Sequence, residues 1–382
     1  MDGKEPKEFI SNRQTVLRFF SVIVFFLLSP FLLGFGPPTL VESDDVKLPV
    51  GKTQLGLLAS AQVPSQLPRA TVIMDLGTGR VVFQRNANTR LPEASITKIM
   101  TAIVVMENAD LNAKVIIVKE DIVEGSAMGI QPGDSYTVEQ LLWGLLVPSG
   151  NDAAMALARH IGGGSVSRFV EMMNQKAKEL RLENTNFVNP HGLHAVNHYS
   201  SAYDIAVMSY YALKYPLFAK IVSTGEYDIQ SPRALKLQTS NQLLYMTADI
   251  PGVTGVKTGY TEEALDCLVA SVDRGGHKIL TVTLGSANRV SATQSLIDYA
   301  YKNFSWTPLS APFSLRGNPS GQLAPASQTE VMLPSWQAGF VGYAVDVGRI
   351  PQDTAIASPV GIVTYYLDGQ ELTRVPLYVQ QR

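Results

Sequence analysis

The order of strand and helix signals restricts the fold of this chain more than any other feature. Runs rich in β-branched and apolar residues occur at 70–74 and 81–83, and they return only near 254–257, 265–272 and 279–284. Helical periodicity fills the region between them and resumes after the last run. The helical segments are 95–106, 138–147, 152–161, 166–180, 202–213 and 290–303. Strands that open and close a domain around central helices predict an α+β fold, with one antiparallel sheet of about five strands flanked by a helical cluster.

Glycine-containing turns connect the expected strands at each end. Leu76-Gly-Thr-Gly79 separates the first two runs, and Arg274-Gly-Gly276 joins the last two as a hairpin. Because both ends contribute strands to the same sheet, we expect the helix that starts at Ser95 to meet the strand that contains Lys257.

The N-terminal segment predicts export from the cytoplasm. An apolar run at 19–35 is interrupted by Pro30. The basic residues that precede this run are Lys4, Lys7, Arg13 and Arg18. This pattern is typical of a signal peptide or an N-terminal membrane anchor, which we assign to residues 1–36. A buried core helix is a third interpretation. Prolines and mixed polar residues at 37–66 predict a linker.

The composition changes after residue 308, where prolines interrupt a polar stretch. Short strand signals follow, with the turn Leu367-Asp-Gly369 between the last two. They lie at 330–333, 339–345, 361–366 and 373–379. We therefore predict a main domain at 67–306 and a small all-β domain at 309–382. The last expected strand ends close to Arg382, so we expect no C-terminal membrane helix.

Composition excludes some classes of function. The formal net charge is −2, which argues against nucleic-acid binding, because neutralising phosphates needs clustered Lys and Arg. With 46% hydrophobic and 17% charged residues, the chain can bury a large core. Cys267 is the single cysteine, so no intrachain disulfide can form.

The first of three short polar clusters is Ser95-Ile-Thr-Lys98, which places a hydroxyl and an amine one helical turn apart. Backbone N–H groups are unpaired at a helix start, so a serine there can attack a carbonyl while its own N–H faces the developing oxyanion. Lys98 can take the serine proton if burial and a nearby cation lower its pKa, and Lys257 could be that cation. The same pattern also occurs in ordinary capped helices.

The second cluster, Ser149-Gly-Asn151, comes just before an expected helix. Ser and Asn both cap helices well, which is the simplest explanation of the pair. In a catalytic interpretation, Ser149 would relay a proton between Lys98 and a leaving amine. Asn151 would form a hydrogen bond with a substrate amide.

The third cluster, Lys257-Thr-Gly259, lies on an expected strand. An edge-strand lysine followed by a turn glycine would give the same pattern. In a catalytic interpretation, Lys257 and Thr258 would hold a substrate carboxylate, and Gly259 would let a peptide lie close. The N–H of Tyr260 would then be a second oxyanion donor. All three clusters in this order predict a Ser-Lys acyl-transfer enzyme that needs no metal or organic cofactor.

His191, His194 and His198 offer a competing interpretation as a metal site. Their H-x2-H-x3-H spacing could place ligands on one face of a helix. However, Pro190 and Gly192 disfavour a helix there, so we expect a loop and no metal.

Longer segments around the clusters resemble a known family. Ala94-Ser-Ile-Thr-Lys-Ile-Met-Thr-Ala102, Pro148-Ser-Gly-Asn-Asp-Ala-Ala154 and Val256-Lys-Thr-Gly-Tyr-Thr261 are similar to the three active-site boxes of low-molecular-mass penicillin-binding proteins, specifically the serine-type D-alanyl-D-alanine carboxypeptidases. Asn189-Pro-His-Gly-Leu193, followed by Tyr199-Ser-Ser-Ala202, resembles the family's loop near the cleft.

The resemblance extends over residues 67–305 and more loosely into the C-terminal module. It implies a β-lactamase/transpeptidase-like main domain, in which Ser95 is the acylated nucleophile and Lys98 its base. The residues that would line the cleft or hold the substrate carboxylate are Ser149, Asn151, Lys257, Thr258 and Arg289. Arg289 could also be an ordinary surface arginine at a helix start.

The resemblance further implies removal of the terminal D-alanine from peptidoglycan pentapeptide stems ending in D-Ala-D-Ala, and covalent inhibition by penicillins and other β-lactams. Such an enzyme would work at the outer face of the cytoplasmic membrane, in the periplasm or in the cell-wall space. The N-terminal segment would contact the membrane if it is not cleaved.

Two other functions compete with this one. A β-lactamase shares Ser-Lys and Lys-Thr-Gly elements and, in one class, uses a glutamate to hydrolyse the acyl-enzyme. Glu179-Leu-Arg-Leu-Glu183 has a faintly similar pattern, but it also fits the charged end of a helix. A non-catalytic cell-wall-binding scaffold is the second alternative, although all the expected reacting groups are present.

Overall fold

The computed structural model describes residues 67–246, 249–309, 322–325, 329–347 and 359–380. The expected export segment and the linker lie outside these residues. Within the described residues, none of the helices has both the length and the apolar character that crossing a membrane requires.

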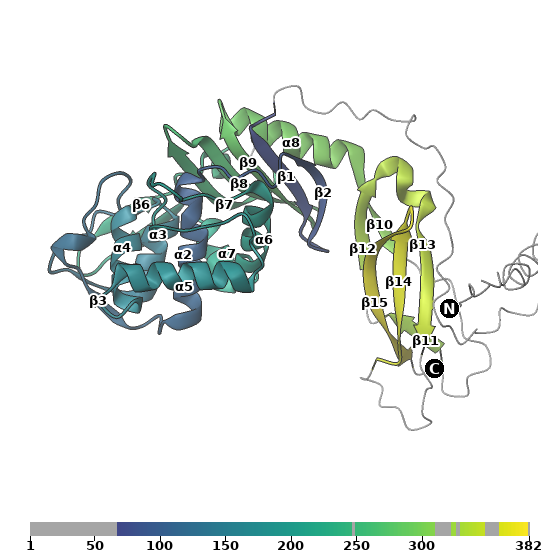
Figure 1. Ribbon diagram of the computed structural model, residues 1–382, viewed down its shortest axis with the longest axis horizontal. Helices are drawn as coiled ribbons and strands as arrows, with labels where there is room; N and C mark the ends of the chain where they lie inside the picture. The colour runs from purple at the N-terminus through teal and green to yellow at the C-terminus, as the bar shows by residue number, and fades with distance from the viewer. Residues whose placement is uncertain (1–66, 247–248, 310–321, 326–328, 348–358, 381–382) are drawn as a thin grey trace, which may run out of the picture.

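A five-stranded antiparallel sheet forms the centre of the main domain (Figure 1). In spatial order its strands are β2 (Arg80–Arg85), β1 (Ala70–Asp75), β9 (His277–Ser286), β8 (Leu265–Arg274) and β7 (Val253–Thr261). Strand β1 pairs with β9, so the two ends of the domain meet in the middle of the sheet. This confirms the α+β prediction, and β7 becomes an edge strand.

Helices cover both faces of the sheet (Figure 1). Helix α8 (Arg289–Asn303) packs on one face, against alternate side chains of β8 such as Leu268, Ala270 and Val272. Cys267 and Val269 point the other way, into the core of the helical cluster. That cluster contains α2 (Lys98–Asn108), α3 (Val138–Leu146), α4 (Asn151–Ile161), α5 (Val166–Glu179), α6 (Ala202–Ala212) and α7 (Pro216–Val222).

The expected helices are confirmed to within a few residues, with one instructive difference. Residues Ala94–Thr97 form a 3-10 turn, η2, and the α-helix begins only at Lys98. Ala94 has a φ of +50°, a left-handed value that an α-helix does not accept. Ser95 therefore lies in a tight turn before α2 and does not open the helix itself.

Short elements that the sequence did not indicate border the helical cluster. They are the hairpin strands β3 (Lys114–Ile116) and β4 (Ser135–Thr137), the hairpin strands β5 (Glu226–Ile229) and β6 (Leu235–Gln238), and the single turns η3 (Lys119–Asp121) and η4 (Gln242–Leu244). All of them are too short to show a clear period in sequence.

The C-terminal part is all β, as predicted. Its strands are β10 (Phe304–Leu309), β11 (Gln322–Pro325), β12 (Thr329–Pro334), β13 (Gly342–Val347), β14 (Gly361–Leu367) and β15 (Gln370–Gln380), with the turn η5 (Ser335–Phe340) after β12. Strand β10 follows α8 directly and pairs with β12. Trp306 stacks on His277 and donates a hydrogen bond to Asp75 Oδ1 (3.0 Å), which connects the two parts of the molecule.

Candidate active site

The turn that carries Ser95 is held between the edge strand β7 and the loop at 189–193. A Cβ atom added to Gly259 would lie 2.8 Å from the carbonyl oxygen of Glu93 and 3.1 Å from Ser95 N. On the other side, a Cβ added to Gly192 would lie 1.9 Å from the carbonyl oxygen of Ala94. Glycine at both positions lets three backbone segments touch. The expected meeting of the Ser95 turn and the Lys257 strand is therefore confirmed.

The amine of Lys98 contacts three other groups of the site. Its Nζ lies 2.7 Å from Ser95 Oγ, 2.7 Å from Asn151 Oδ1 and 2.8 Å from the carbonyl oxygen of His191. A neutral amine has two protons and one lone pair. Asn151 and His191 offer only acceptors to this amine, so they would take its two protons. The lone pair is then left for the hydroxyl proton of Ser95.

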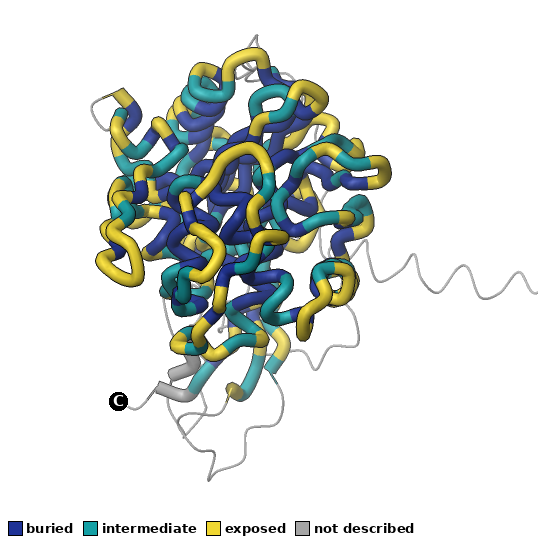
Figure 2. The backbone as a smooth tube through the Cα atoms, turned by 90° about the vertical axis from the view of Figure 1, so that its left-hand side faces the viewer, coloured by how far each residue is buried: buried dark blue, intermediate teal, exposed yellow. Residues whose placement is uncertain are grey.

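Two lysines of this site are buried. Lys98 is 0% exposed, and burial followed by the nearby charge of Lys257 lowers its pKa well below the ordinary value, although Asp152 opposes the shift. Burial, followed by the charge of Arg289, lowers the pKa of Lys257 to about 7. Its Nζ donates to the carbonyl oxygen of Thr258 (3.1 Å). Figure 2 shows that buried residues fill the interior of the molecule and exposed residues lie on its outside.

Asp152 is a supporting residue that the sequence did not reveal. Its two oxygens accept hydrogen bonds from the backbone N–H groups of Met128 (2.8 Å) and Gly129 (2.9 Å). Beside it, Asn151 Nδ2 donates to the carbonyl oxygen of Glu124 (2.7 Å). These bonds fasten the 124–130 loop to the start of α4. They also orient Asn151 so that its Oδ1 faces Lys98.

Ser149 occupies an unfavourable position next to Asn151. Its φ is +67°, and its Oγ is buried without a hydrogen-bond partner among the residues that the structure describes. An unsatisfied buried hydroxyl costs about 1–3 kcal/mol, and a left-handed non-glycine residue a similar amount. Such features collect at functional sites, which is consistent with a hydroxyl kept available for substrate.

The remaining expected substrate residues lie at the β7 edge and at the start of α8. Thr258 Oγ1 is 2.8 Å from Ser240 Oγ, and the Tyr260 side chain is largely exposed. Arg289 forms an ion pair with Asp266 (3.2 Å), and its backbone N–H bonds to the same carboxylate. Asp266, which the sequence did not suggest, therefore orients Arg289. After burial, the charge of Arg289 is the second cause of the lowered pKa of Lys257.

The three histidines do not converge on a point. His198 contacts Thr97 and Glu93, His194 is 4.0 Å from Glu263, and His191 Nδ1 accepts the N–H of Leu193. No helix forms over 191–198, as expected for a loop. Within the described ranges, no three side chains of His, Cys, Asp or Glu are grouped as metal ligands would be.

The glutamate expected of a β-lactamase is also placed elsewhere. Glu179 is the last residue of α5, where its carboxylate pairs with Lys176 (2.7 Å). Glu183 is exposed beyond the end of that helix. The segment is thus the charged end of a helix and supplies no carboxylate to Ser95.

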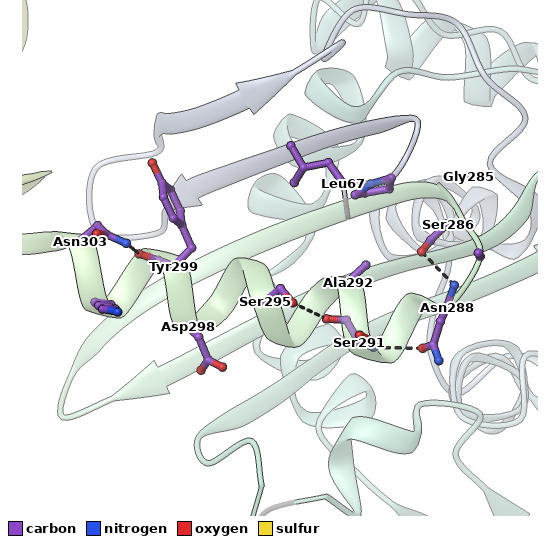
Figure 3. A pocket seen from close by; sticks show the side chains of 13 residues that line it. Leu67, Gly285, Ser286, Asn288, Ser291, Ala292, Ser295, Asp298, Tyr299 and Asn303 are labelled. Carbon is purple, nitrogen blue, oxygen red and sulfur yellow. Dashed lines mark hydrogen bonds between the residues drawn. The ribbon is translucent and has the colours of Figure 1, made fainter. Parts of the chain in front are cut away.

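A hollow of about 820 Å³ lies along the outer surface of α8 (Figure 3). Ser291, Ser295 and Asp298 line it from the helix, and Leu67 lies opposite. None of the residues bonded to Lys98 lines this hollow, so it is separate from the site described above.

Comparison with known protein families gives a match over residues 59–288 to the family described as D-alanyl-D-alanine carboxypeptidase. Among curated proteins, D-alanyl-D-alanine carboxypeptidase DacF of Bacillus subtilis is 37% identical over 294 residues, which cover 74% of this chain and 71% of that protein. DacC of Escherichia coli is 29% identical over 353 residues, covering 84% and 86%.

Two solved structures, one of a DD-transpeptidase and one of a penicillin binding protein, are also similar to this chain. A Streptomyces DD-transpeptidase superimposes with a TM-score of 0.60 at 35% identity and covers 63% of this chain and 98% of its own. Penicillin binding protein 5 of Haemophilus influenzae superimposes with a TM-score of 0.68 at 28% identity, covering 83% and 97%.

Proposed function

Because the chain belongs to the D-alanyl-D-alanine carboxypeptidase family, we propose that it removes the terminal D-alanine from peptidoglycan pentapeptide stems through a Ser95 acyl-enzyme. The observation that carries this proposal is the 2.7 Å contact between Ser95 Oγ and the fully buried amine of Lys98. A deprotonated lysine at this distance can act as the base that a serine nucleophile needs.

Acylation begins when Lys98 Nζ takes the proton of Ser95 Oγ. The oxygen attacks the carbonyl carbon of the penultimate D-alanine, and the negative charge that develops on the carbonyl oxygen faces the N–H groups of Ser95 and Tyr260. The C–N bond then breaks, and the leaving amine receives the proton from Lys98 through the Ser149 hydroxyl. The product is a Ser95 ester and free D-alanine.

Deacylation uses the same groups in reverse. A water molecule gives a proton to Lys98 and attacks the ester carbonyl, and Ser95 Oγ leaves with that proton. Until the terminal D-alanine leaves, Lys257 and Thr258 would bind its carboxylate, with Arg289 adding positive charge nearby. Asn151 would bind the substrate amide from the other side of the cleft. Gly259 would let the peptide lie against β7.

The site would be delivered outside the cytoplasm by the 1–36 segment, either as a cleaved signal peptide or as a membrane anchor. Residues 37–66 would be the linker, 67–306 the peptidase domain and 309–382 the C-terminal β domain. This arrangement fits an enzyme whose polymeric substrate lies beyond the cytoplasmic membrane.

The pH dependence of kcat/KM should be bell-shaped, with its alkaline limb set by Lys257. A lysine is charged only below its pKa, and the pKa of Lys257 is about 7, so carboxylate binding should weaken as pH rises through that value. The acidic limb comes from protonation of Lys98. Lys257→Arg, which keeps its charge, should move the alkaline limb upward in assays with a D-Ala-D-Ala peptide. An unmoved alkaline limb would exclude this role for Lys257.

The reaction itself is tested by mass spectrometry of purified muropeptides after incubation with the enzyme. We expect pentapeptide stems to lose one alanine mass, and Ser95→Ala to leave them intact. A fluorescent penicillin should label the wild type and not Ser95→Ala. Rapid turnover of penicillin would instead indicate a β-lactamase, and an unlabelled wild type would indicate a scaffold.

A further inference from the structure

One buried hydrogen-bond network fastens both ends of the turn that carries Ser95. Glu93 precedes the turn, Thr97 ends it, and His198 comes from the loop before α6. Glu93 Oε1 lies 3.1 Å from Thr97 Oγ1 and 3.1 Å from His198 Nε2, and those two atoms lie 2.8 Å from each other. The exposed fractions of the three residues are 0%, 0% and 5% in the order named.

The direction of these hydrogen bonds follows from a fourth group. The backbone N–H of Val188 donates to His198 Nδ1 (3.0 Å), so that nitrogen carries no proton. The neutral ring then carries its proton on Nε2, which points at Thr97 and Glu93. Thr97 Oγ1 in turn donates to Glu93. The ring N–H and the threonine hydroxyl, which come from separate segments, therefore form one network that ends on a single carboxylate oxygen of Glu93.

The turn depends on such outside contacts. It has four residues, so it cannot build the repeated i→i−4 hydrogen bonds of a long helix, and it includes the left-handed Ala94. The loop that ends in His198 also supplies the carbonyl of His191, to which Lys98 donates. The network thus ties the nucleophile and its base to the same loop.

We propose that Glu93 and His198 are positioning residues that set the distance between Ser95 Oγ and Lys98 Nζ. They touch neither the substrate nor the reacting atoms, and they act through the η2 turn, which contains Ser95 and is followed directly by Lys98. The inference rests on the proposed function, because the Ser95–Lys98 distance matters only if Lys98 is the base.

The test measures acylation by a fluorescent penicillin in the full chain, with burst titration to count active molecules. Burst kinetics also separate the binding constant from the acylation rate constant. Glu93→Ala removes the shared acceptor and should slow the acylation step roughly 10–100-fold, since a misplacement of about 1 Å costs about 10² in rate. The binding constant should stay the same. Glu93→Gln keeps an acceptor oxygen and should restore the rate to within about threefold.

Thr71→Val is the matched control for losing a buried hydrogen bond. Thr71 is 0% exposed and donates to the carbonyl of Val282 within the sheet, away from the turn. It should lower the melting temperature without slowing acylation. Wild-type acylation rates in Glu93→Ala, or equal losses in Glu93→Ala and Glu93→Gln, would overturn the positioning role alone. A wild type that is not labelled at Ser95 would overturn the proposed function and this inference together.

Discussion

Replacing Lys98 by methionine is expected to lower the second-order rate constant of acylation by on the order of 10²–10⁴, the usual contribution of a general base. Methionine fills the same buried space but cannot accept a proton. The effect should appear in the chemical step, because Lys98 Nζ bonds to Ser95 Oγ and to two acceptor oxygens of the protein and is not assigned a contact with the substrate. Stopped-flow acylation with a reporter β-lactam gives the rate constant.

An exposed lysine provides the control for this replacement. Lys220 lies on the surface of α7, and Lys220→Met should acylate at the wild-type rate. Acylation of Lys98→Met at more than about one tenth of the wild-type rate would contradict the assignment of Lys98 as the base.

Adding a single methyl group at Gly192 should slow acylation by about 10²-fold or more, although glycine has no side chain that could react. The new Cβ of Gly192→Ala would lie 1.9 Å from the carbonyl oxygen of Ala94, so the loop and the Ser95 turn must separate. His191, whose carbonyl accepts a hydrogen bond from Lys98, would move with the loop. With the same β-lactam, the burst amplitude gives the fraction of active molecules, and the acylation rate constant gives the loss in the chemical step.

Gly276 separates this steric effect from backbone strain. It has the same φ of +88° as Gly192, but an added Cβ would meet nothing within 4 Å. Gly276→Ala should therefore carry the strain of a left-handed alanine and acylate normally. Equal behaviour of the two variants would mean that the contact between Gly192 and Ala94 is unimportant for catalysis.

The sheet and the meeting of the clusters were predictable because their signals are local. Apolar periodicity identifies each strand and helix from its own residues, and the strand–helix–strand order leaves few ways to build one sheet. The position of Ser95 beside β7 follows from that topology. The Ser-x-x-Lys spacing likewise places Lys98 near Ser95 in almost any tight turn or helix.

The shape of the nucleophile turn was not predictable. An alanine gives no sign that it will adopt a positive φ, and the glycines next to Ala94, Gly192 and Gly259, come from distant segments. The supporting role of Asp152 was not predictable either, because it too depends on contacts with a distant segment. An acidic residue in the first turn of a helix is explained by the helix dipole alone, and its bonds to Met128 and Gly129 become visible only in three dimensions.

The chemistry of the two lysines was only partly predictable. The sequence places an amine on each side of a predicted site, but the pKa of each depends on burial. Lys98 and Lys257 are 0% and 1% exposed, which no pattern of polar residues reveals. Asp266 beside Arg289 is a further example, since the pair joins β8 to the start of α8.

The most direct test of the account is the protonation state of Lys98 itself. NMR of enzyme labelled with ¹³C at the lysine Cε carbons would follow each side chain through a pH titration, and Lys98→Arg would assign the signal. We expect the Lys98 signal to show a neutral amine well below the ordinary lysine pKa of about 10.4. A Lys98 signal that titrates at that ordinary value would mean that the amine is charged when Ser95 reacts, and the proposed mechanism would be wrong.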